Sequence, residues 1–416
     1  MVAAQQASEY FRQLENSLAL LQEEDLPGIH QAAAAVAGKL AAGGSLFVYD
    51  SIGSFTSEAT GRAGGLTDIS RVRHAADAER RLSADGVLIV GARSAADPEA
   101  AEVARVAKEA NALVIAVCPA GAGLPDVADF FLNDRAPGDG GVVHLPSLSS
   151  PVCPTVGVLN TVVLWALVAQ TVKELIERGH VPRVWKSIQL HGSSDYNRNT
   201  RSDPPLKPIT VASRGRISRD RAAEYLSKAR RVLSDIRAEE MHKIAEVASL
   251  AAATILQGNA AFHFDVGHMS PGETRPERAG NPRVFKEGEG WLAAETLEEV
   301  GPADFVLWGS VLGGQKAEVP AVRGLHARGV KIACIYDPSS PEQAIREDPS
   351  GQTVSDFAVT VIEGHYPVAD GCLSFDEMAV PVCPLSGFVN FSVYWAIAAQ
   401  TAANLLAAGA ALPGAG

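Results

Sequence analysis

The sequence predicts an α/β protein in which two doubly wound, parallel-sheet domains of flavodoxin-like type lie in tandem and pack as an internal pseudo-dimer. Two observations predict this fold. Ala222–Asp265 aligns with Ala7–Asp50 without a gap, at an offset of about 215 residues. Within each copy, short apolar strands alternate with helical segments, which is typical of a parallel sheet. A repeat of this length has the size of a domain, and two copies of one fold in a chain usually pack together.

The later part of each copy also repeats. Pro151–Pro154 returns as Pro381–Pro384, and the apolar helix that follows carries a tryptophan in each copy. Arg201–Arg216 is rich in proline and is typical of an extended linker. We therefore expect one domain over residues 1–205 and a second over residues 206–416.

Each copy is expected to begin with a long amphipathic helical stretch, Glu9–Ala41 or Ser218–Leu256, and the first of these contains Pro27-Gly28, where we expect a break. Four strands per copy follow. They are predicted at Leu46–Tyr49, Gly86–Val90, Ala112–Val117 and Gly141–His144 in the first copy, and at Ala261–Phe264, Phe305–Trp308, Val330–Ile335 and Phe357–Val361 in the second.

Charge and hydropathy limit the partners. The net charge of -12 and the pI near 5.4 argue against a nucleic-acid partner, which would require a basic face. The longest apolar run, Val156–Val172, contains Asn160, Thr161 and Gln170, so we interpret it as a buried helix rather than a membrane span. The N-terminus lacks the basic and apolar regions of a signal peptide. We expect a cytoplasmic protein without a membrane partner.

The five cysteines are scattered and show no metal-ligand spacing. We expect buried, reduced thiols and neither a metal nor another cofactor. Cys153 and Cys383 occupy equivalent positions before the last helix of each copy, and we expect them buried near the contact of the halves. An oxidisable pair is the alternative.

The loops after the first two strong strands are the places to look for a ligand, because parallel sheets bind ligands beyond the carboxyl ends of their strands. Their small and hydroxyl-bearing residues, at the start of helices, suit a phosphate or a sugar. Ordinary helix capping explains the same residues equally well. The substrate-binding candidates from these loops are Ser51, Gly53, Ser54, Arg93, Ser94, Gly267, Ser270 and Ser310.

Several motifs together resemble the sugar isomerase (SIS) domain family, and most closely its single-domain phosphosugar isomerase branch. The matching pieces are Phe264–His268 (Phe-x-x-Gly-His), Arg62–Gly65 (Arg-Ala-Gly-Gly), Gly138-Asp139 with its echo Asp370-Gly371, and the segment His191–Asn197. The resemblance implies a five-stranded parallel sheet in each domain and a phosphosugar site at the contact between the two domains. Neither Gly91–Asp97 nor Gly309–Gln315 has the density of Ser and Thr that is typical of the family's phosphate loop.

Aldose–ketose isomerisation needs a carboxylate base and an acid that protonates an oxygen of the sugar. By the resemblance, Glu58 is the candidate base, and His268 in the Gly-His loop of the second copy is the candidate acid. Three further residues, His191, Asp195 and His365, are candidates for substrate binding. Each of these residues also has a purely structural interpretation.

The leading hypothesis is a protein that binds a small sugar derivative at the interface of its halves, with aldose–ketose isomerase activity, and that can form a homodimer. A non-catalytic sugar-phosphate sensor is the alternative, and a degenerate scaffold is a third. Dinucleotide binding is disfavoured because no Gly-x-Gly-x-x-Gly follows a strand.

Overall fold

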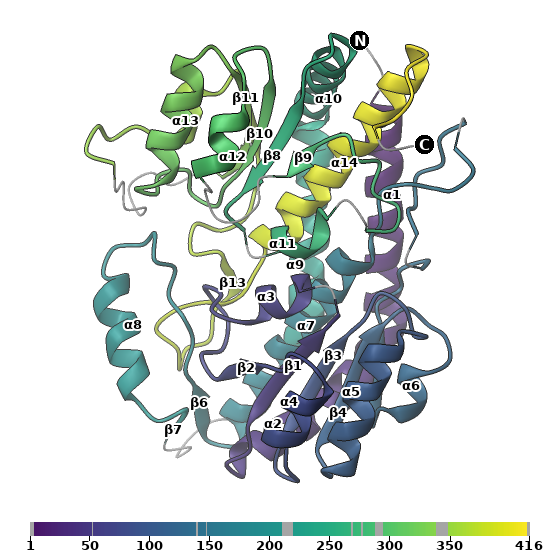
Figure 1. Ribbon diagram of the computed structural model, residues 1–416. Coiled ribbons are helices and arrows are strands. Elements are labelled where there is room, and N and C mark those ends of the chain that lie inside the picture. Colours follow the sequence, from purple (N-terminus) through teal and green to yellow (C-terminus); the bar gives the residue numbers. More distant parts are fainter. Residues whose placement is uncertain are drawn as a thin grey trace.

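The computed structural model describes residues 4–51, 53–138, 140–146, 148–209, 219–267, 269–275, 278–287, 294–337 and 348–413. Over these residues the chain forms two α/β lobes, one for each copy of the repeat, joined by long helices that run between them (Figure 1). The fold class predicted from the sequence is confirmed.

The sheet of the first copy has the order β2-β1-β3-β4-β5 and is parallel throughout. Its strands are β1 (Leu46–Asp50), β2 (Ile69–Arg71), β3 (Val87–Gly91), β4 (Leu113–Cys118) and β5 (Phe130–Asn133). Asp50 pairs with Gly91 in the register, so the loops after β1 and β3 begin side by side at one edge of the sheet.

The sheet of the second copy has the same arrangement, β9-β8-β10-β11-β12, and is also parallel. Its strands are β8 (Ala261–Asp265), β9 (Lys286–Glu287), β10 (Phe305–Gly309), β11 (Lys331–Tyr336) and β12 (Thr360–Glu363). Asp265 pairs with Gly309, as Asp50 does with Gly91. The two lobes therefore carry equivalent loop edges.

One predicted strand is wrong. Gly141–His144 forms only a bridge, between Val143 and Val152, and the edge strand of the first sheet is β5 instead. The apolar run of β5 is only Phe130–Leu132, which is shorter than the runs that identified the other strands, and Phe131 is 37% exposed. The outer strands β2 and β9 were also not predicted, because they are short and mostly polar.

The long N-terminal stretches are each divided into two helices. The first contains α1 (Gln5–Leu20), a π-helical turn (Leu21–Asp25) and α2 (Leu26–Ala41), and the second contains α9 (Arg221–Glu239) and α10 (Met241–Leu256). Pro27 lies in the first turn of α2, where its missing N–H costs no helical hydrogen bond, so the break precedes the proline.

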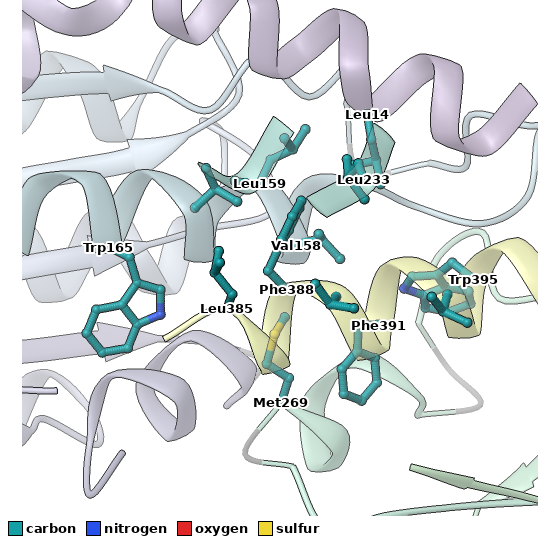
Figure 2. Packing of buried hydrophobic residues seen from close by; sticks show 14 of the residues in the cluster. Leu14, Val158, Leu159, Trp165, Leu233, Met269, Leu385, Phe388, Phe391 and Trp395 are labelled. Carbon is teal, nitrogen blue, oxygen red and sulfur yellow. The ribbon is translucent and has the colours of Figure 1, made fainter. Parts of the chain in front are cut away.

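The N-terminal helices tie the halves together. α2 packs on α7 (Val156–Glu177) of its own copy, and α10 packs on α14 (Ser386–Ala407), whereas α1 packs against α14 and α9 against α7 of the other copy. Side chains from α1, α7, α9 and α14, among them Leu14, Val158, Leu233 and Phe391, meet in one apolar cluster that contains residues of both copies (Figure 2). The halves therefore share a core instead of meeting at a polar interface.

α7 is the one described helix that is long and apolar enough to cross a membrane by length and composition, and its apolar window is entirely buried inside the protein. Burial of this kind identifies a core helix. The remaining elements are α3 (Ser54–Ala59), α4 (Ala75–Arg81), α5 (Pro98–Glu109), α6 (Leu124–Val127), β6 (His180–Pro182), α8 (Ser193–Ser202), β7 (Leu206–Pro208), α11 (Ser270–Glu273), α12 (Ala294–Glu299), α13 (Glu318–Ala327), a 3-10 turn (Val354–Phe357), β13 (Gly371–Leu373) and β14 (Val382–Pro384).

The predicted linker is more ordered than its proline content suggests. Its beginning belongs to α8, and β7 pairs with β6 in a small antiparallel sheet. Residues 210–218 lie outside the described part of the chain.

Candidate functional site

A buried ionic cluster lies where the first copy meets the last helix of the second. Arg62 Nε lies 3.1 Å from Glu58 Oε1, and Arg62 Nη2 lies 3.0 Å from Asp370 Oδ2. Arg62 Nη2 also donates a hydrogen bond to Ser386 Oγ. Burial raises the pKa of Glu58, against the opposing effect of Arg62. These four residues are called the Arg62 cluster.

Ser54, Glu273 and Arg278 form the equivalent Arg278 cluster on the other side of the interface. Arg278 Nη2 lies 3.0 Å from Glu273 Oε2, and Ser54 Oγ donates to Glu273 Oε1 over 3.0 Å. Arg278 is buried, yet its Nε, Nη1 and Nη2 atoms make no hydrogen bond to the described residues. Among the residues that the structure describes, Arg62 is paired with two carboxylates and Arg278 with one.

A glycine near the start of each final helix makes room for these carboxylates. A Cβ atom on Gly157 of α7 would lie 1.8 Å from Glu273 Oε1, and one on Gly387 of α14 would lie 2.6 Å from Glu58 Oε1. Each glutamate thus lies against the N-terminal turn of the other copy's final helix, where the helix dipole favours negative charge.

The segments Cys153-Pro154 and Cys383-Pro384 also contribute hydrogen bonds between the two copies. Cys383 N donates to Gly64 O over 3.0 Å, and Cys153 N donates to Gly280 O over 2.7 Å. Both cysteines are buried, with φ of 62° and 63°. The predicted burial of these cysteines at the contact of the halves is confirmed.

A cleft of about 220 Å³ opens beside the Arg62 cluster. Val266, which follows β8, and Val311 and Gln315, which follow β10, line it from the second copy. Arg62 and the segment 185–201 line it from the first copy. The cleft therefore lies at the carboxyl ends of the second sheet, where parallel sheets bind ligands, and is covered by the first copy.

Residues 185–201, called the cover segment, are fixed by hydrogen bonds. Gly64 N donates to Trp185 O over 2.8 Å, and Trp185 N donates to Gly65 O over 3.0 Å. Asn197 exchanges two bonds of 2.9 Å with the backbone of Lys186. α8, which contains the end of this segment, lies below the second lobe at the left of Figure 1.

Two cationic side chains of the cover segment, Lys186 and Arg201, line the cleft, in a chain whose net charge is -12. The charge of Arg62, which also lines the cleft, is balanced by the carboxylates of Asp370 and Glu58. The Arg201 guanidinium lies 5.0 Å from the ring centroid of Trp185. An arginine stacked in this way keeps its N–H groups available for an anion.

Most polar groups of the first-copy loops are occupied by other protein groups. Ser51 Oγ donates to Asp97 Oδ2 over 2.6 Å, Gly53 N donates to Asp50 Oδ2 over 2.8 Å, and Ser94 Oγ accepts from Ala96 N over 3.2 Å. Ser54 belongs to the Arg278 cluster, and Arg93 is half-buried.

The second-copy candidates lie nearer the cleft. Gly267 and Ser310 adjoin the lining residues Val266 and Val311. Gly267 N donates to the carboxylate of Asp265, and Ser310 Oγ accepts from Gly313 N over 3.0 Å. His268 and the side chain of Ser270 lie outside the described part of the chain.

The remaining candidates do not line the cleft. Glu58 has no exposed surface and lies behind Arg62. His365 Nε2 lies 3.6 Å from Glu240 Oε1, at the junction of α9 and α10. His191 and Asp195 are exposed residues of the cover segment.

Sequence reasoning missed the residues of the cover segment that line the cleft, chiefly Trp185, Lys186, Gln189 and Arg201. The resemblance drew attention to His191–Asn197, only a few residues further along the chain. Within that range Asn197 lines the cleft, and its amide holds the backbone of Lys186. A motif in an irregular segment does not indicate which of its neighbours face a ligand.

Glu318 supports the loop that carries Gln315 and was not predicted. It has no exposed surface, accepts from Trp308 Nε1 over 3.2 Å, and accepts from Gln315 N over 3.3 Å. Burial raises the pKa of Glu318 to about 7. The folded protein therefore binds this proton more tightly than the unfolded chain, in which the pKa is about 4.5.

Glu318→Gln is expected to change how stability depends on pH. Protonation of Glu318 stabilises the fold, so the unfolding free energy of the wild type should rise, relative to the variant, as the pH falls from about 8 to about 5. The slope should approach about 1.4 kcal/mol per pH unit between the two pKa values. Urea unfolding at pH 5, 6, 7 and 8 measures it, with the exposed Glu102→Gln as control. A wild-type-minus-variant difference that is constant with pH would contradict the assignment.

Sequence comparison finds relatives the size of one copy. No protein-family model matches the chain. A UPF0309 protein of Halalkalibacterium halodurans is 25% identical over 226 residues, which cover 45% of this chain and 90% of that protein. A UPF0309 protein of Streptomyces coelicolor is 27% identical over 215 residues, which cover 44% of this chain and 83% of that protein.

Solved structures match the whole chain. A candidate phosphosugar isomerase of Clostridium difficile 630 aligns over 98% of this chain and 95% of its own, with a TM-score of 0.54 and 8% identity. This chain therefore shares the two-domain α/β fold of that structure. A candidate phosphosugar isomerase of Silicibacter pomeroyi DSS-3 aligns over 97% of this chain and 99% of its own, with a TM-score of 0.51 and 12% identity.

Proposed function

We propose that this tandem SIS protein binds a small sugar derivative carrying an anionic group, of the phosphosugar class, in the cleft between its domains. The observation that carries the proposal is the placement of two cationic side chains, Lys186 and Arg201, in the lining of that cleft, at the strand ends of the other domain. The names of the structural neighbours point to the same ligand class. We propose residues 1–205 and 206–416 as the two domains, and a cytoplasmic location.

The size of the cleft favours a compact ligand. At about 220 Å³ it is smaller than the roughly 300–1,000 Å³ of sites for drug-sized molecules. A larger cavity of about 830 Å³ lies between β1 and the small β6–β7 sheet, where its lining includes Ser45, Leu46 and Leu206. Ser45 and Leu46 mark the amino end of β1. Since parallel sheets bind ligands at their carboxyl ends, we assign the ligand to the smaller cleft.

Burial of Glu58 favours binding over isomerisation. A catalytic base must come within hydrogen-bond reach of the proton that it removes from the sugar. Glu58 is fully buried, paired with Arg62, and accepts from Trp165 Nε1 over 3.4 Å. We therefore propose that Glu58 positions Arg62 and that the protein is a non-catalytic sensor of its ligand, with isomerase activity as the alternative.

Thermal unfolding with glucose 6-phosphate, fructose 6-phosphate and glucosamine 6-phosphate tests binding. We expect at least one to stabilise the protein more than the neutral sugar does, by about 2.7 kcal/mol at a concentration 100 times its Kd. Arg201→Gln should remove most of this stabilisation without changing the melting temperature of the free protein, because Arg201 is exposed. Arg198→Gln, on the same helix and 74% exposed, is the matched control. Absence of stabilisation by all three sugar phosphates would reject the proposal.

Hydrogen exchange in D₂O separates the sensor from the isomerase. An isomerase exchanges the carbon-bound proton of its substrate with solvent through an enediol, whereas a sensor does not. We expect no deuterium in the bound sugar phosphate by NMR. Incorporation that is lost in Glu58→Gln would establish the isomerase instead.

A further inference from the structure

Gln189 of the cover segment is a buried polar residue with an unused hydrogen-bond acceptor. It lines the cleft, is 6% exposed, and its side-chain Oε1 accepts no hydrogen bond from the residues that the structure describes. Native proteins rarely leave a buried acceptor without a partner, because its desolvation is then uncompensated. An ordered water or a bound molecule can supply the missing partner.

The chemistry of an amide oxygen defines that molecule. Oε1 can only accept, so its partner must carry a hydroxyl or an N–H group. The charged groups on the same segment, Lys186 and Arg201, can only donate, and they suit an anion. Asn197, which also lines the cleft, already uses its amide oxygen and nitrogen on the backbone of Lys186.

The opposite wall comes from the second domain and contains Val266 and Val311, which are apolar, and Gln315 and Asp370, which are polar. The carboxylate of Asp370 already binds Arg62 and Ser386. The cationic side chains and Gln189 lie on the first domain, in a segment that crosses to cover the other domain's strand ends. A ligand in the cleft would contact both domains.

We propose that Gln189 is a specificity-determining residue that accepts a hydrogen bond from a hydroxyl group of the ligand. With Lys186 and Arg201 at the anionic group, it selects a polyhydroxy phosphate over a deoxy analogue of the same charge. This inference rests on the proposed function, because the ligand occupies the same cleft.

Calorimetric titration of the wild type and Gln189→Met tests the inference. Methionine keeps the length of the side chain and removes the amide oxygen. The probes are the tightest binder among glucose 6-phosphate, fructose 6-phosphate and glucosamine 6-phosphate, its monodeoxy analogues, and inorganic phosphate. In the wild type, one deoxy analogue should bind about tenfold more weakly than its parent. In Gln189→Met the parent should lose about tenfold in affinity and this discrimination should disappear, while the affinity for phosphate stays the same.

Two controls keep the outcomes separate. Ser194→Ala changes an exposed residue of the cover segment and should bind as the wild type does. Gln189→Glu retains an acceptor oxygen but adds a negative charge, so it should weaken all the anionic probes, inorganic phosphate included. If the wild type binds sugar phosphates and Gln189→Met keeps both affinity and discrimination, the inference is wrong while the proposed function stands. If the wild type binds none of the probes, both are wrong.

Discussion

Replacement of Arg62 by methionine is expected to lower the free energy of unfolding by about 3–5 kcal/mol. Arg62 is 3% exposed and is paired with the carboxylates of Glu58 and Asp370. Methionine fills a similar volume, so the main effect is to leave two buried carboxylates without their cation. Urea denaturation of the purified variant measures the loss.

Two comparisons make this prediction specific. Arg278→Met should cost less, because among the described residues Arg278 has one carboxylate partner, Glu273, and its three guanidinium nitrogens make no hydrogen bond. Arg12→Met, at an exposed pair with Glu9, should leave stability unchanged. The cost at Arg62 should also shrink on acidification, because the raised pKa of Glu58 lets that carboxyl group accept a proton in the folded state. An Arg62 variant as stable as the wild type would show that the cluster is not part of the folded interface.

The tandem fold could be predicted from the sequence because its signal is repeated. The same pattern of helix, strands and Cys-Pro segment occurs in both copies, so the position of each element could be checked in the other copy. The central strands β1, β3, β8 and β10 are also mostly apolar and buried. The edge strands β2 and β9 carry no such signal, since few of their residues are buried. The packing of α1 and α9 against the final helix of the other copy could not be predicted either. An amphipathic sequence specifies the apolar face of a helix but not the element that covers this face.

The site was only partly accessible to sequence reasoning. The Arg62–Gly65 motif and Asp370 were singled out from the resemblance, and the structure brings Arg62 and Asp370 together across the interface. The resemblance also selected Glu58, but its full burial depends on Gly387 of the other copy, more than three hundred positions away. Gln189 and Arg201 carry no motif and reach the cleft only through the path of the cover segment. Long-range packing of this kind is absent from any local pattern.

Gly157→Ala is expected to destabilise the protein by about 2–4 kcal/mol, although the same change in an exposed helix usually stabilises by about 0.5–1 kcal/mol. The new Cβ would lie 1.8 Å from Glu273 Oε1. Glu273 has no exposed surface and is held by Arg278 and Ser54. The clash therefore displaces the carboxylate from its buried partners, and the helix cannot shift without moving the shared core.

Gly38→Ala is the matched control. Gly38 lies in α2, and a Cβ atom there would meet no other part of the protein within 4 Å. We therefore expect Gly38→Ala to stabilise the protein. Gly387→Ala should cost less than Gly157→Ala, since its Cβ would lie 2.6 Å from Glu58 Oε1. A double-mutant cycle with Glu273→Ala isolates the contact: once the carboxylate is removed, Gly157→Ala should add little further loss. If Gly157→Ala lowers the free energy of unfolding equally in the wild type and in Glu273→Ala, its effect arises from another contact of α7. If Gly157→Ala instead stabilises the protein, as Gly38→Ala should, then Glu273 does not lie against this helix.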